Sequence, residues 1–232
     1  MRLLTRTAPP TTVPASDIVS LVKAAGVSLE KHGLTGQRAA VYLVLDHSGS
    51  MAPYYASGDV QRLAEQALGL SANVDDDGTV PLVMFGSDAG PVVDLDLTDY
   101  AGTVERQHQR TRWGSTNYVA AMDAVVRHYE ASGADVPALV IFQTDGDPDS
   151  PDDTSWALLR ASSKPIFWAF VGFGGHVSFL EQLDTMAGRV VDNASSFHAA
   201  TPRTVSDAAL YDGITGEYAR WLPAARRAGV LA

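Results

Sequence analysis

One carboxylate and two hydroxyl side chains alternate along a short polar segment of the chain, at Asp46, Ser48 and Ser50. Gly49 lets the backbone turn tightly between the two serines, so the three side chains can reach a common point. Carboxylate and hydroxyl oxygens are suitable ligands for a hard divalent cation. The same residue types are common in ordinary turns, so this segment alone would indicate only a turn.

The residues before Asp46 indicate where this polar segment lies in the fold. Residues 41–45 are apolar at every position, which is typical of a central parallel strand with helices on both faces. In an α/β sheet, ligands bind outside the carboxyl ends of such strands. We therefore expect Asp46 to lie at a ligand site.

The pattern Asp-x-Ser-x-Ser resembles the metal-ion-dependent adhesion site (MIDAS) of von Willebrand factor A (vWA) domains, which has further residues in two other loops. Gly114-Ser115-Thr116-Asn117 precedes a helical pattern and matches the threonine loop of the family, although Ser115 replaces the second of two usual glycines. Thr144-Asp145-Gly146 follows another apolar run, 138–142, and matches the third part. The resemblance implies a metal site formed by Asp46, Ser48, Ser50, Thr116 and Asp145.

The ligands in this set determine which ion is expected. Two carboxylates and three hydroxyls, without His or Cys, indicate Mg²⁺ or Mn²⁺, and Ca²⁺ less so because tight calcium sites use more carboxylates and more ligands. The resemblance implies that Ser48 and Ser50 bind the ion directly and that the other three residues bind it directly or through water. In the family, a Glu or Asp of a partner protein takes the open coordination position, and we expect the same kind of partner here.

Several further segments are similar to the bacterial tellurium-resistance (TerF-like) branch of these domains. They are Ser28-Leu29-Glu30-Lys31, the residues from Leu45 to Met51, Asp76-Asp77-Gly78, Phe85-Gly86 and the segment from Gly114 to Tyr118. This resemblance covers residues 16–232 and is most specific at the three site loops. It implies an intracellular stress-response protein. We expect a protein of the cytoplasm that binds a partner and is not an enzyme.

A magnesium-dependent phosphohydrolase is the alternative function for the same oxygen cluster, because magnesium with carboxylates is the usual apparatus of phosphoryl transfer. The familiar phosphatase strand end has a second Asp two residues after the first, where this chain has Ser48. No lysine lies in the three loops to neutralise a transferred phosphate. The sequence therefore favours a binding module.

Two features of these loops, a tryptophan and an acidic run, each have two possible interpretations. Trp113 can contact a partner or pack against the first helix. An acidic run near Asp145 is typical of a solvated loop, with a second cation site as the alternative. The run contains Asp147, Asp149, Asp152 and Asp153.

Composition limits the other classes of protein. The chain has 232 residues with 46% hydrophobic residues, which is enough for one α/β domain, expected over residues 16–232 after a flexible tail at 1–15. There is no cysteine, so disulfides and thiolate metal sites are excluded. A net charge of -10 argues against nucleic acid as a partner, and no segment approaches the roughly 18 apolar residues of a membrane span.

Alternating strand and helix patterns predict a doubly wound, mostly parallel sheet with helices on both faces and one antiparallel edge strand. The expected strands are 41–45, 79–85, 91–95, 136–142, 165–171 and 189–191. Gly26 is expected to end the first helix, and residues 27–31 read either as an edge strand or as the last turn of that helix. The other expected helices are 59–70, 98–108, 118–126, 154–161, 179–186 and one from 206 onward.

Overall fold

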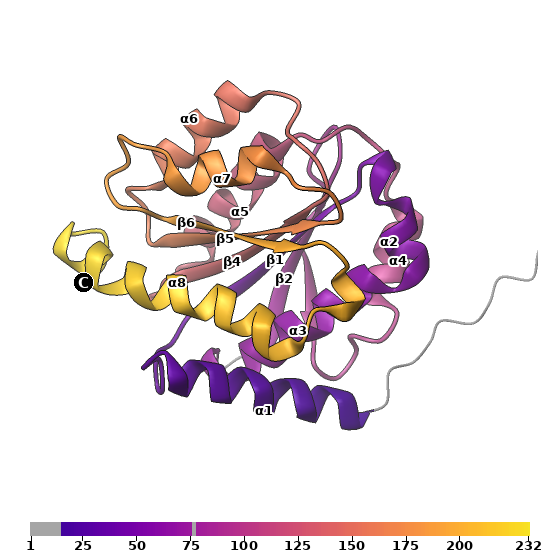
Figure 1. Ribbon diagram of the computed structural model, residues 1–232, viewed down its shortest axis with the longest axis horizontal. Coiled ribbons are helices and arrows are strands. Elements are labelled where there is room, and N and C mark those ends of the chain that lie inside the picture. The colour runs from indigo at the N-terminus through magenta and orange to yellow at the C-terminus, as the bar shows by residue number, and fades with distance from the viewer. Residues whose placement is uncertain (1–14, 76–77) are drawn as a thin grey trace, which may run out of the picture.

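The computed structural model describes residues 15–75 and 78–232, so all of the predicted tail except Ala15 lies outside the described residues, as do Asp76 and Asp77. Its centre is a six-stranded sheet in the order β3-β2-β1-β4-β5-β6 (Figure 1). All neighbouring strands are parallel except β2 and β3, which are antiparallel. The strands are β1 Ala40–Asp46, β2 Thr79–Phe85, β3 Val93–Asp96, β4 Ala138–Thr144, β5 Ile166–Phe173 and β6 Ala194–Ala199. The predicted fold class is therefore confirmed.

Helices cover both faces of this sheet. The helices α1, α3 and α8 lie on one face and α5, α6 and α7 on the other, while α2 and α4 lie near one end of the sheet (Figure 1). The helices are α1 Ala15–Lys31, α2 Ala52–Ser57, α3 Asp59–Val74, α4 Thr103–Arg110, α5 Tyr118–Ser132, α6 Pro151–Ala161, α7 Ser178–Thr185 and α8 Asp207–Arg227. The described residues also form two short 3₁₀ turns, Gly49–Met51 and Pro202–Thr204. Among the described helices, none is both long and apolar enough to cross a membrane.

The central strand β1 shows why its sequence is apolar at every position. Val41, Leu43 and Leu45 belong to the apolar cluster under α1, α3 and α8. Tyr42 and Val44 belong to the cluster on the other face. Successive side chains of a strand point to opposite faces, so a strand with helices on both sides needs apolar residues throughout.

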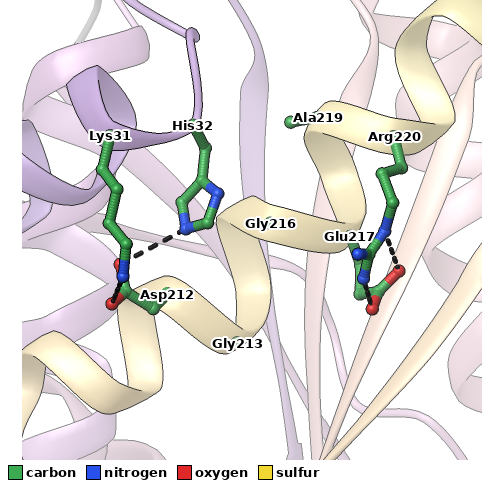
Figure 2. A pocket seen from close by; sticks show the side chains of 8 residues that line it. All are labelled: Lys31, His32, Asp212, Gly213, Gly216, Glu217, Ala219 and Arg220. Atoms are coloured by element: carbon green, nitrogen blue, oxygen red, sulfur yellow. Dashed lines mark hydrogen bonds and ion pairs between the residues drawn. The ribbon is translucent and has the colours of Figure 1, made fainter.

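The first helix differs from its prediction, because α1 runs through Gly26 and includes residues 27–31. A Cβ atom at Gly26 would lie 3.0 Å from the Asn73 side chain on α3, so the glycine permits close packing of two helices instead of ending one. The last turn of α1 is then fixed to α8. Ser28 Oγ and Lys31 Nζ both donate to the carboxylate of Asp212, at 2.6 Å each, and Figure 2 shows the Lys31 contact.

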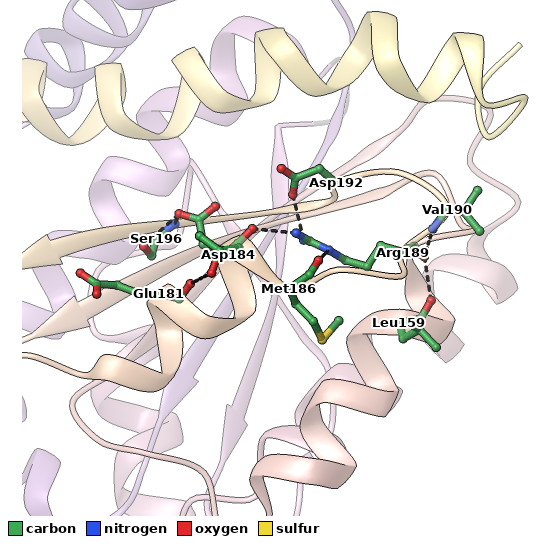
Figure 3. A network of polar contacts seen from close by, with 10 residues as sticks. Leu159, Glu181, Asp184, Met186, Arg189, Val190, Asp192 and Ser196 are labelled. Carbon is green, nitrogen blue, oxygen red and sulfur yellow. Dashed lines mark hydrogen bonds and ion pairs between the residues drawn. The ribbon is translucent and has the colours of Figure 1, made fainter.

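The predicted strand at 189–191 is wrong, and the last strand is β6 instead. Arg189, with a side chain only 4% exposed, donates to the main-chain oxygens of Met186 and Asp184 and forms an ion pair with Asp192 at 2.8 Å (Figure 3). These contacts fold the segment around a buried guanidinium, which a regular strand at the sheet edge could not do. Val190 is consequently 56% exposed.

Two smaller differences concern helices near the site. The helix α2, which follows the Asp46 loop directly, was not predicted from the sequence. The helix α4 begins at Thr103 and not at Thr98, because Thr98 forms a turn in which its N–H and its hydroxyl both donate to Asp96 Oδ1 at 2.6 Å. Such local side-chain to main-chain bonds compete with a helical conformation.

Candidate metal centre

Asp46 is the last residue of β1 and is fully buried. Strands β1 and β4 are paired with Leu45 opposite Gln143, so Asp46 and Thr144 reach the carboxyl edge at the same level. Asp46 Oδ1 accepts a hydrogen bond from the Ser48 N–H at 2.7 Å, and Oδ2 accepts one from the Thr144 hydroxyl at 2.6 Å. Burial nevertheless raises the pKa of Asp46 to about 6, because these bonds offset only part of the desolvation.

Ser48, Ser50 and Asp145 continue this arrangement. The 3₁₀ turn Gly49–Met51 brings the Ser50 hydroxyl within 3.1 Å of the Ser48 hydroxyl. Ser50 Oγ also donates to Asp145 Oδ1 at 2.7 Å, and burial raises the pKa of Asp145 as well. Four of the five predicted residues are thus joined by a continuous chain of hydrogen bonds from Asp46 to Asp145.

Thr116 reaches the same region from a different direction. The Gly114 N–H donates to the main-chain oxygen of His47 at 3.1 Å, and Gly114 forms an isolated parallel bridge with Ser48. A Cβ atom at Gly114 would lie 2.4 Å from the Ser87 nitrogen, so only glycine permits this approach. The Thr116 N–H donates to Asp149 Oδ1 at 3.0 Å. The loop therefore lies beside Ser48, although no described hydrogen bond joins the Thr116 hydroxyl to the other four residues.

Two residues around Asp46 were not identified as functional from the sequence. Thr144 fixes one carboxylate oxygen of Asp46, and Tyr55 on α2 donates to the main-chain oxygen of Asp46 at 2.9 Å. Thr144 directly precedes Asp145, so the sequence places it near the site. Its hydrogen bond to Asp46, however, depends on the register between β1 and β4, which the sequence does not reveal. Tyr55 gave no signal because α2 was not predicted.

An aromatic group surrounds the main chain of the Asp46 loop. Trp113 is stacked on the buried ring of His47, with centroids 4.1 Å apart, and contacts Tyr55 at its edge. His47 Nε2 is 2.9 Å from Nδ1 of His108 on α4. Trp113 thus packs against Tyr55 of α2, a helix that was not predicted, while 44% of its surface stays exposed.

The residues present fit a hard divalent cation. The set consists of two carboxylates and three hydroxyls, and such oxygens are the ligands that Mg²⁺ and Mn²⁺ prefer. The pKa values of Asp46 and Asp145 are both raised, mainly by burial, and no described basic side chain is paired with either carboxylate. Two acids, one fully and one partly buried and neither with a described basic partner, are what a divalent ion would neutralise.

A cavity of about 540 Å³ lies elsewhere in the molecule, between the end of α1 and α8 (Figure 2). Its charged side chains are paired with one another: Lys31 contacts Asp212, and Arg220 contacts Glu217. These pairs leave no group of free carboxylates there for a cation.

The whole-chain comparisons agree with the geometry. A family model named vWA-TerF-like, described as the vWA found in the TerF C terminus, matches residues 38–231. The chain belongs to this family. It is also 33% identical over 216 residues to a protein of Bacillus subtilis (strain 168) named "Uncharacterized protein YcbR", which corresponds to 90% of this chain and 88% of that protein. The resemblance to vWA domains of the TerF-like branch is therefore confirmed.

Solved structures share the fold at low sequence identity. A von Willebrand factor type A protein from Catenulispora acidiphila has a TM-score of 0.57 at 16% identity, covering 78% of this chain and 42% of that one. Proximal thread matrix protein 1 from the mussel byssus, solved with a zinc-occupied MIDAS motif, has a TM-score of 0.54 at 16% identity, covering 78% and 48%. Manganese-loaded TRAP protein of Plasmodium vivax has a TM-score of 0.50 at 19% identity, covering 77% and 75%. This chain spans less than half the length of the first two proteins.

Proposed function

We propose that this vWA domain is a divalent-metal-dependent protein-binding module of a bacterial tellurium-resistance or stress-response system. The observation that carries the proposal is the burial of the Asp46 carboxylate without a basic partner. Asp46 is fully buried at the carboxyl end of the central strand, its pKa is raised to about 6, and no described basic side chain is paired with it. A buried charge of this kind is costly unless it is paired or bound to a metal. The neighbouring oxygens of Ser48, Ser50 and Asp145 make a metal the natural partner.

Each of the five residues has a distinct part in this proposal. Asp46 and Asp145 balance the charge of one Mg²⁺ or Mn²⁺, while Ser48, Ser50 and Thr116 supply neutral oxygens. When bound, the ion would supply a positive centre for a Glu or Asp side chain of the partner. Zinc in the MIDAS of the mussel protein and manganese in the Plasmodium protein support a divalent ion in this fold.

A phosphohydrolase function finds less support in the same geometry. Ser48 stands where a phosphatase would have its second carboxylate, and its N–H is used to orient Asp46. The described lysines lie outside the three site loops: Lys31, for example, is paired with Asp212, and Lys164 is paired with Glu130. Hydrolysis of a phosphate ester that Asp46→Ala abolishes would favour the enzyme over the binding module.

Capture of a partner from a lysate of the native host tests the proposal. The purified chain is immobilised and exposed to the lysate with Mg²⁺, with Mg²⁺ plus an excess of chelator, and as the Asp46→Asn variant with Mg²⁺. We expect at least one protein to be retained only by the unaltered chain in the presence of Mg²⁺. Retention of the same proteins under all three conditions would contradict the proposal.

A further inference from the structure

The acidic loop after β4 contacts the threonine loop through one residue, Asp149. Asp149 Oδ1 accepts from the Thr116 N–H at 3.0 Å, and Oδ2 accepts from the Ser115 hydroxyl at 2.6 Å. The Asp149 N–H in turn donates to the Thr116 main-chain oxygen at 3.0 Å. Three hydrogen bonds thus join two loops that are more than 30 residues apart in the chain. We call these contacts of Ser115, Thr116 and Asp149 the Asp149 clamp.

Ser115 links the Asp149 clamp to the strand on the other side of the loop. Its N–H donates to Ser87 Oγ at 3.1 Å, just after β2. Asn117 also contacts this segment, because its side-chain amide donates to the Ser87 main-chain oxygen at 3.0 Å. Ser115 stands where a glycine is usual in the threonine loop of these domains, and a glycine would lack the hydroxyl that Asp149 binds. The substitution therefore has a structural consequence in this chain.

The geometry gives one residue of the acidic loop a specific role. Both carboxylate oxygens of Asp149 accept hydrogen bonds from the threonine loop, and hydrogen bonds to an ionised carboxylate are stronger than those between neutral groups. A carboxylate used in this way orients its donors. Asp149 is thus a positioning residue for the loop that carries Thr116.

We propose that Asp149 acts on the metal site through Thr116: the Asp149 clamp holds the threonine loop where the Thr116 hydroxyl can serve as a ligand. This inference rests on the function proposed above. It assigns a role to Asp149, which is not one of the five predicted ligands. It also explains how the threonine loop is held in place, although no described hydrogen bond joins the Thr116 hydroxyl to the other four ligands. Holding a donor in its bound position lowers the cost of ordering it when a ligand arrives.

Titration of the whole 232-residue chain with Mn²⁺ alone, in a double-mutant cycle, tests the inference. Thr116→Ala and Asp149→Ala should each weaken Mn²⁺ binding by about 3- to 10-fold, since each removes one neutral ligand directly or indirectly. The double variant should bind no more weakly than the weaker single variant. Asp147→Ala is the matched control, because it removes an equal charge from the same loop without touching the Asp149 clamp, and it should leave the Thr116→Ala effect unchanged.

Amide hydrogen exchange gives a second readout that needs no metal. In Asp149→Ala, the Thr116 amide should exchange faster, while the Gly114 amide, which is bonded to the His47 oxygen, should keep its rate. Losses that add in the double variant, or an Asp149→Ala variant with unchanged Mn²⁺ affinity, would overturn the inference but leave the proposed function standing. An unchanged affinity in Thr116→Ala would overturn it as well. Absence of Mn²⁺ binding in the unaltered chain would overturn both.

Discussion

The two sides of the candidate site are held in different ways. Asp46 is fully buried at the end of the central strand, and both oxygens of its carboxylate are fixed by groups of the sheet and the adjoining turn. Thr116 lies on a partly exposed loop, and its described hydrogen bonds are made by its main chain, chiefly to the exposed residue Asp149. The charged side of the site is therefore part of the core, whereas the neutral side depends on a few contacts near the surface.

Under the proposed function, this difference would separate the residues that hold the ion from the residue that responds to a partner. Moving Asp46 would disturb the packing of β1 against β4, so its side of the site should be the same in every state of the protein. The threonine loop is held by a few hydrogen bonds near the surface, so shifting it disturbs less of the packed core than moving Asp46 would. A ligand can move an equilibrium only through a difference in affinity between two states, and under the proposed function Thr116 would provide that difference.

The largest effect on stability is expected from Asp46→Asn. The pKa of Asp46 is about 6 in the folded chain, against an ordinary value of 3.8 for an unfolded one, so the folded form binds protons more tightly. The free energy of unfolding without metal should therefore fall as pH rises from 3.8 past about 6, by up to about 3 kcal/mol for this difference in pKa. Above about pH 6, Asp46→Asn should be more stable than the unaltered chain in chelator, because the amide carries no buried charge.

Urea unfolding in chelator at several pH values measures this difference. The stability difference between Asp46→Asn and the unaltered chain should shrink as pH falls from about 7.5 toward 4, where Asp46 becomes protonated. The Thr144 hydroxyl also lies 3.2 Å from the Gly146 main-chain oxygen, so it can donate there and accept from the new amide. An Asp46→Asn variant that is less stable than the unaltered chain at every pH would show that burial of the Asp46 charge does not destabilise the fold.

An intermediate effect is expected from Thr144→Val, which keeps the shape of the side chain. It removes the donor to Asp46 Oδ2 in a fully buried position, and leaving a buried acceptor without its partner costs about 1–3 kcal/mol. Thermal unfolding in chelator at a pH near neutrality measures the loss. Equal stability of the variant and the unaltered chain would mean that the Asp46 carboxylate is not fixed by β4.

The smallest effect on stability is expected from Thr116→Val, the matched change on the other side of the site. Its loop position is partly exposed and the main-chain bonds to Asp149 are retained, so the change should be within about 0.5 kcal/mol. A loss as large as that of Thr144→Val would remove the distinction between the two sides.

Partner capture should depend on Thr116 more strongly than metal binding does. Because Thr116 is neutral, Thr116→Ala should weaken Mg²⁺ binding far less than the loss of Asp46 or Asp145 does, and should weaken partner capture by a larger factor than Mg²⁺ affinity. Calorimetry and capture from lysate compare the two quantities, with circular dichroism confirming the fold. Equal loss of both affinities would make Thr116 a constant ligand, and the site would have no switch of this kind.

The sequence was most informative where a pattern is local. The continuous apolar run at 41–45 predicts β1, and the change of polarity at Asp46 places that residue at the edge of the sheet. The closing helix follows in the same way from Leu210, Ile214 and Tyr218, all of which are buried. The resemblance to vWA domains then supplied Thr116 and Asp145, which lie in loops far apart in the chain. Their role as ligands stays a prediction that the titrations above address.

What the sequence could not provide depends on contacts between distant segments. The Thr144 bond to Asp46 requires the register of β1 and β4, and the Asp149 bond to Thr116 requires two loops to meet. The misassigned segments have the same cause. Gly26 lies inside a helix, where a Cβ atom would meet the Asn73 side chain of α3, and the Arg189 guanidinium is buried among main-chain oxygens where a strand was predicted.

The central claim is that Asp46 belongs to a site for one divalent ion, and calorimetric titration with Mg²⁺ at about pH 7.5, where Asp46 is ionised, tests it most directly. The unaltered chain should bind a single ion, and neither Asp46→Asn nor Asp145→Ala should give measurable heat of binding at the same concentrations. Binding of Mg²⁺ with unchanged affinity and stoichiometry in both variants would contradict the account.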